Sequence, residues 1–204
     1  MVNFGEAFKR PFEKMVIGII LNIIPIVNFL STGYLLQVAK TAKKKELPEW
    51  VDWGNLFIRG FIAEVIKVIY FLPAIIVFIA TLGTAILSVL LGSSTIGKMA
   101  FIQGLTSMGS GLFVFVVLFL LAAYIVPAAW TNYAIKGKFG SAFALKEITA
   151  KAFTGNYFVA WLTGTIYSCL VLLFAILTMA IAAPMFFVTR VTLYTLIGDV
   201  FTSK

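Results

Sequence analysis

The sequence contains no histidine and a single cysteine, and each shortage excludes a kind of chemistry. Histidine is the usual proton carrier near neutral pH and the commonest metal ligand, so its absence weighs against acid–base catalysis and against many metal sites. Because Cys169 stands alone, the chain forms no disulfide within itself. We therefore predict that the protein is not an enzyme and has no catalytic residues, no cofactor and no metal site.

Charged residues are also scarce. They make up 12% of the sequence, whereas 61% of the residues are hydrophobic, and the mean hydropathy is +1.04. A water-soluble domain of this size cannot bury so much apolar surface, so lipid must surround most of it. The composition predicts an all-α fold, a polytopic integral membrane helix bundle that forms one transmembrane domain over residues 1–204.

Crossing the hydrocarbon core takes about 20 apolar residues in a helix, and this length divides the chain into spans and connections. About four stretches are predicted to be spanning helices, namely 71–91, 112–134, 157–182 and 184–201. Phenylalanines at helical spacing predict a short interfacial helix at 1–14, and a four-residue repeat that includes Arg59 and Lys67 predicts an amphipathic helix at 56–70. A polar loop is predicted at 40–55, a glycine- and serine-rich connection at 92–111 and a surface helix at 139–153.

The first hydrophobic segment, residues 15–39, has polar breaks at its centre. Asn22, Pro25 and Asn28 interrupt it, and the backbone groups that a proline frees need other partners. The segment is therefore predicted to be kinked or re-entrant. The break either lines a polar cavity, as broken helices do in transporters, or is a kink satisfied by neighbouring helices.

Basic residues outnumber acidic ones by 16 to 8, and their distribution predicts a topology. Region 40–67 holds six, region 136–151 four and region 92–111 one. The positive-inside rule makes the first two cytoplasmic in a multi-pass protein of the cell membrane. Anionic lipid headgroups of the bilayer explain the excess better than nucleic acid does, so we expect no nucleic-acid partner.

Boundary aromatics and a stripe of small residues are further candidates for specific roles. The predicted membrane-interface anchors are Trp50, Trp53, Trp130 and Tyr133. The small residues that recur every four positions in the third span are Ala160, Gly164 and Ser168. They form either a helix-packing or dimer face, or only the usual small-residue content of membrane helices. Arg190 and Asp199 are about 2.5 helical turns apart and form no intrahelical pair.

Short motifs spread over most of the chain carry a family resemblance. Their residues are Gly33, Tyr34, Leu47, Pro48, Trp50, Asp52, Gly60 and Pro73, followed by the stretch 139–143. With this set the chain resembles the uncharacterised prokaryotic membrane protein family called domain of unknown function 4013. It departs from the pattern at Gln37, where a basic residue is expected. The resemblance implies a multi-helix bacterial or archaeal membrane protein and brings no activity with it.

These observations leave three hypotheses about function. The leading one is a non-enzymatic scaffold or interaction component of a membrane complex, whose partner is a second copy or another membrane protein. The first alternative is a small-solute transporter or channel subunit, which the broken first segment favours. The second alternative is a bilayer-sensing or bilayer-shaping protein, which the predicted surface helices favour.

Overall fold

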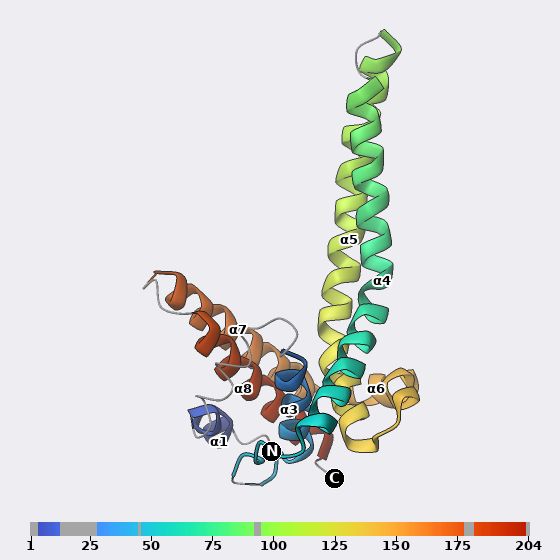
Figure 1. Cartoon of the computed structure of the whole chain (residues 1–204). Coiled ribbons are helices and arrows are strands. Elements are labelled where there is room, and N and C mark those ends of the chain that lie inside the picture. Colours follow the sequence, from blue (N-terminus) through green and yellow to red (C-terminus); the bar gives the residue numbers. More distant parts are fainter. Residues whose placement is uncertain (1–3, 13–27, 45, 92–94, 178–181, 203–204) are drawn as a thin grey trace. The chain divides into compact units, whose positions relative to one another are not determined.

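The computed structural model describes residues 4–12, 28–44, 46–91, 95–177 and 182–202 (Figure 1). Every regular element within these residues is a helix, which confirms the all-α class and agrees with a helix bundle. The elements are α1 (Phe4–Lys9), η1 (Arg10–Phe12), α3 (Asn28–Lys40), α4 (Trp53–Leu91), α5 (Thr95–Lys136), η2 (Phe139–Phe143), α6 (Leu145–Ala152), α7 (Gly155–Leu177) and α8 (Ala182–Thr202).

Three helices in the described part of the chain are long and apolar enough to cross a membrane. These candidate spans are Trp53–Leu87 in α4, Met108–Lys136 in α5 and Gly155–Phe174 in α7. The fourth predicted stretch, 184–201, forms most of α8, whose residues from Phe187 onward are mostly buried. These helices are consistent with a membrane protein.

The chain forms two compact units. The core unit comprises residues 1–66 and 125–204, and the hairpin unit comprises residues 67–124. Both α4 and α5 contribute to each unit, because the division falls within these two helices.

Within the hairpin unit, α4 and α5 lie side by side (Figure 1). Aromatic rings join them, with centroids 5.1 Å apart for Phe71 and Phe119. Gly111 leaves room for Thr81, since a Cβ at position 111 would lie 2.2 Å from the Thr81 hydroxyl oxygen. Small residues of this kind let two helices approach closely.

Both hairpin helices extend further than predicted. The proposed boundary between 56–70 and 71–91 does not exist, because α4 continues through Pro73. The predicted connection at 92–111 is helical from Thr95 onward. A proline removes one backbone donor, and a helix keeps the remaining groups paired where water is absent. The glycines and serines between positions 95 and 111 likewise lie inside α5 and do not end it.

In the core unit, α8 packs against α1, η1, α3 and α7. Two glycines bring its neighbours close. A Cβ at Gly198 would lie 2.2 Å from the Ala39 carbonyl oxygen of α3, and one at Gly164 of α7 would lie 2.5 Å from Leu193 Cδ1. The side chains of Phe187, Val191 and Ile197 are fully buried. Helix α8 is therefore the centre of this unit.

Two glycines also define the crossing of α3 and α4. A Cβ at Gly33 would lie 1.9 Å from the Leu56 carbonyl oxygen, and one at Gly60 would lie 1.8 Å from that of Phe29. Both obstacles are backbone atoms, so only glycine fits at either position. The Thr32 hydroxyl donates to a Glu64 carboxylate oxygen at 3.1 Å and links the same two helices.

Candidate functional site

Arg10 of η1 is the most deeply buried charged residue that the structure describes, with 1% of its surface exposed. Its guanidinium donates hydrogen bonds to three carbonyl oxygens and one hydroxyl. The acceptors are Glu46 O at 3.1 Å, Ala42 O at 3.2 Å, Thr41 O at 3.3 Å and Thr195 Oγ1 at 3.4 Å. We call this arrangement the Arg10 clamp.

The clamp lies on the turn that follows α3. Its carbonyl acceptors belong to Thr41, Ala42 and Glu46, which all come after Lys40, the last residue of α3. A guanidinium presents five donors in a rigid plane, so one arginine can satisfy several carbonyls at once. The clamp therefore joins η1, the turn after α3 and the middle of α8.

Lysines occupy the carbonyl end of α8. Lys43 donates to Thr202 O at 2.6 Å, and Lys151 donates to Phe201 O at 3.4 Å. Lys43 belongs to the basic region 40–67, and Lys151 belongs to the basic region 136–151. Both predicted basic regions therefore meet at one end of the core unit.

A separate polar contact attaches the end of α5 to η2 and α6. Lys136 forms an ion pair with Glu147, and the Asn132 amide donates to Ser141 O at 2.7 Å. The hydrogen bond from Lys136, together with a second from Asn132, holds the pKa of the exposed Glu147 carboxyl below its ordinary value. The connection between α5 and α7 is thus fixed to the core unit.

The family-like aromatic residues come together beside α3. The rings of Tyr34 and Trp50 are stacked, with centroids 3.8 Å apart and planes 4° apart. The Tyr34 hydroxyl donates to Pro48 O at 2.9 Å, and Leu47 is buried. This packing gives the stretch before α4 a defined shape.

Helix α4 begins at a strained residue. Asp52 has a φ of 57°, a left-handed conformation that aspartate adopts more readily than most residues. Its carboxylate accepts hydrogen bonds from the Asn55 amide at 3.0 Å and from the Asn55 backbone N–H at 3.4 Å. Asp52 therefore caps the first turn of α4.

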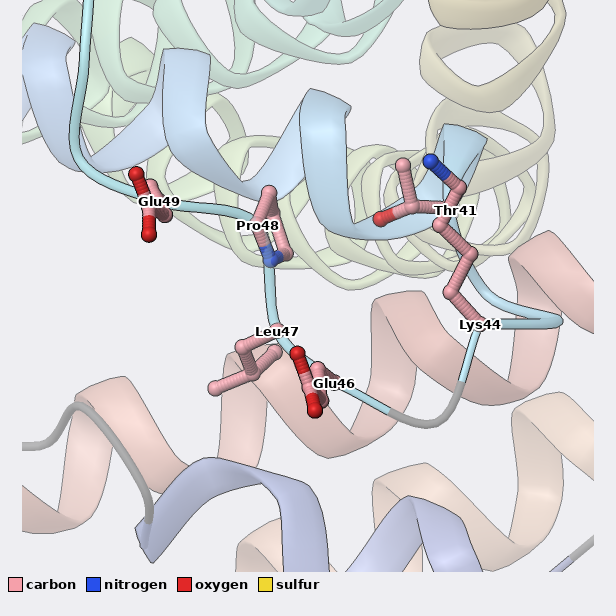
Figure 2. Close-up of a pocket in the computed structure, with 6 residues that line it drawn as sticks. All are labelled: Thr41, Lys44, Glu46, Leu47, Pro48 and Glu49. Atoms are coloured by element: carbon pink, nitrogen blue, oxygen red, sulfur yellow. The ribbon is translucent and has the colours of Figure 1, made fainter.

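An open groove of about 360 Å³ lies on the turn between α3 and α4 (Figure 2). It is lined by Thr41, Lys44, Glu46, Leu47, Pro48 and Glu49. The Thr41 hydroxyl donates to Gln37 O at 2.8 Å, so its oxygen can only accept further bonds. Two carboxylates and one ammonium group make this lining suited to a ligand that carries both charges. In the part of the chain that the structure describes, no three His, Cys, Asp or Glu residues could hold a metal ion.

The predicted anchors differ in their surroundings. Trp130 is buried, donates from its indole nitrogen to Ala63 O at 2.8 Å and stacks on Tyr194 with centroids 5.5 Å apart. Tyr133 is also buried, whereas Trp53 is exposed. Their role at a membrane boundary stays a prediction.

The other candidate residues fall in separate places. Asn28 begins α3, while Asn22 and Pro25 lie outside the described residues. Ala160 is fully buried and Gly164 faces Leu193 of α8, so this helix of the same chain occupies part of the small-residue stripe. The Ser168 hydroxyl bonds back to Gly164 O at 2.8 Å.

Sequence reasoning missed the clamp. Arg10 looked like a surface charge of an interfacial helix, and its hydroxyl acceptor Thr195 is 185 positions away. The one local signal is Pro11, because the residue before a proline is disfavoured in an α-helix. That signal explains why α1 ends at Lys9, but it does not identify what Arg10 binds.

Comparison with known proteins gives one match. A family model described as a protein of unknown function, DUF4013, matches residues 16–195. No curated protein and no solved structure matches the chain. The matched region contains the four acceptors named above, while Arg10 itself precedes it.

Replacing Arg10 by alanine should destabilise the protein strongly. Several buried acceptors would lose their partner, which should lower the free energy of unfolding by about 3 kcal/mol. Lys9→Ala removes an exposed charge one residue away and should change the free energy of unfolding by less than about 0.5 kcal/mol. Unfolding in detergent, followed by tryptophan fluorescence, measures both. Equal small effects of the two substitutions would contradict the assignment of the clamp.

Proposed function

The chain belongs to the DUF4013 family of proteins of unknown function, and we propose that it is a non-enzymatic scaffold that holds other components of a membrane complex. In this proposal the candidate spans lie in the bilayer, and their outer surfaces bind partner helices as well as lipid. The polar end of the core unit keeps the connecting turns in a fixed arrangement. A prokaryotic source and the absence of enzymatic activity stay predictions.

The observation that carries the proposal is how little of the candidate spans is buried within the chain. The buried share is 11% for the span in α4, 17% for that in α7 and 28% for that in α5. Continuous apolar surface of this extent marks a membrane or protein interaction site. Lipid covers such a surface without specificity, so specific partners require a recognisable feature on it.

Two glycines of the hairpin unit supply such a feature. No atom lies within 4 Å of a Cβ built at Gly83 in α4 or at Gly109 in α5, whereas Gly111 already faces Thr81. Outward glycines on an apolar helix allow another backbone to approach closely. Together with the exposed apolar side chains around them, they favour binding to a helix of another membrane protein.

Co-purification tests the scaffold. A tagged chain isolated from native membranes should bring defined membrane proteins with it, as identified by mass spectrometry. Gly83→Ile and Gly109→Ile should lower their yield about tenfold, which corresponds to a loss of about 1.4 kcal/mol. Gly140→Ile, which also adds a side chain in open space but outside the spans, should have no effect. If the chain is always isolated alone and as a monomer, the proposal is wrong. If the partner is a second copy of the chain, the protein is a homo-oligomer.

We also propose a topology for the core unit. The clamp holds Arg10 against the turn at 41–46, and lysines from both basic regions meet the end of α8. These contacts support placing residue 10, both basic regions and residue 202 on one side, and the positive-inside rule makes that side cytoplasmic. If the segment between Arg10 and Thr41 enters the membrane, it then has to return to the same side, as a re-entrant segment does.

Cysteine labelling tests this topology, because Cys169→Ala gives a background without cysteine. Single cysteines at Lys9, Lys44 and Lys146 should react with a membrane-impermeant maleimide only after cells are permeabilised. A cysteine at Lys98 should react on intact cells. Labelling of position 9 from outside would exclude a re-entrant first segment, and labelling of position 146 from outside would reverse the orientation.

The two alternatives differ in their support. Of the residues behind the transporter hypothesis, the described part of the chain includes only Asn28, and no specific observation favours transport. The surface elements η2 and α6 do give specific support for a direct interaction with the bilayer surface.

A further inference from the structure

Large apolar side chains are exposed in the connection between two candidate spans. The span in α5 ends at Lys136 and α7 begins at Gly155. Between them, Phe139 is 46% exposed, Leu145 is 56% exposed and Phe153 is 69% exposed. Three such side chains within one short connection make it a candidate interaction surface.

The register of α6 places two of these side chains on one strip. Leu145, Thr149 and Phe153 follow one another at intervals of four residues, so they lie along one side of the helix. Ile148 and Ala152 occupy the side that packs into the core unit and are fully buried. Helix α6 thus has one broad apolar face, of which one part is buried against the core unit and the adjoining strip is exposed.

Basic residues flank this outer strip. Lys138 precedes Phe139, and Lys146 follows Leu145, with both side chains exposed. The neighbouring lysines are engaged, since Lys136 pairs with Glu147 and Lys151 bonds to Phe201 O. Apolar residues edged by lysines are the composition of a helix that lies in the boundary of an anionic membrane.

The position of the strip selects the membrane as its partner. In the proposed membrane location, both flanking residues, Lys136 and Gly155, are ends of candidate spans and lie at the level where the bilayer meets water. A helix tied to the core unit at this level can insert its outer strip by about 5–10 Å without leaving its place. Its lysines then reach the phosphate groups of the same leaflet.

We infer that η2 and α6 form an interfacial wedge: Phe139, Leu145 and Phe153 insert between the headgroups of one leaflet, and Lys138 and Lys146 bind anionic phospholipids. The inference rests on the proposed membrane location and adds a lipid class and the residues that recognise it. It does not depend on whether the hairpin unit binds partner helices.

Lipid-dependent quenching tests the wedge in the full chain. In the Cys169→Ala background, a bimane probe is attached to a single cysteine at Thr149, on the strip, or at Ala150, an exposed residue about 100° further round α6. A probe at Ile76, an exposed apolar position of the hairpin unit, serves as the positive control. Each protein is reconstituted in nanodiscs of phosphatidylcholine with phosphatidylglycerol, or of phosphatidylcholine alone, that contain spin-labelled acyl chains.

We expect the spin-labelled lipid to quench the Thr149 probe about threefold more than the Ala150 probe in the anionic nanodiscs. This difference should shrink in phosphatidylcholine alone, and it should shrink equally in anionic nanodiscs for a Lys138→Gln, Lys146→Gln variant. Both lysines are exposed, so the variant should fold, which its circular dichroism and elution volume verify.

Three results would overturn the wedge. Quenching of the Thr149 probe by aqueous iodide and not by lipid would place the strip in water, and quenching by neither would mean that protein covers it. Insertion that is independent of anionic lipid would refute the proposed lipid class. Absence of lipid quenching at the Ile76 control probe would instead refute the membrane location itself. If the wedge probe is quenched as expected but no partner co-purifies, only the scaffold proposal is refuted.

Discussion

The buried Arg10 guanidinium depends on the carbonyl groups of the turn that follows α3. A charged group with 1% exposure is unstable without several acceptors, and this turn supplies Thr41 O, Ala42 O and Glu46 O. Their contact fixes three elements at once, because Thr195 of α8 shares the same guanidinium. The turn that carries the groove of Figure 2 is held in place by the same contact, through Glu46 O.

The clamp also changes how the basic residues are understood. Arg10 binds the turn after α3, Lys43 and Lys151 bind the carbonyl end of α8, and Lys136 is paired with Glu147. Part of the positive charge therefore stabilises the fold. The number and distribution of basic residues alone attribute all of it to lipid headgroups and topology. Lys138 and Lys146 are exposed and flank exposed apolar side chains. They are therefore the lysines that we propose to bind the membrane surface. Structural cations and proposed lipid-binding cations thus occupy different positions in one connection.

The all-α class and the candidate spans could be predicted because they depend on composition and on the length of apolar runs. Helix ends were less predictable, since Pro73 and the glycines between positions 95 and 111 lie inside continuous helices, although both residue types often end a helix. The role of Gly33 and Gly60 at the crossing of α3 and α4 depends on backbone atoms of another helix, which sequence does not reveal. The clamp was hidden for a related reason, because its partners are 31 to 185 positions away from Arg10.

Amide hydrogen exchange of the full chain in lipid nanodiscs tests most directly whether the clamp unites these elements. In Arg10→Ala, amide exchange should become about tenfold faster in three segments at once: residues 4–12, the turn at 41–46 and the second half of α8. Exchange in residues 67–91 and 95–124 should stay unchanged, because they form a separate unit. Faster exchange confined to residues 4–12 would contradict the account, since Arg10 would then hold only its own segment.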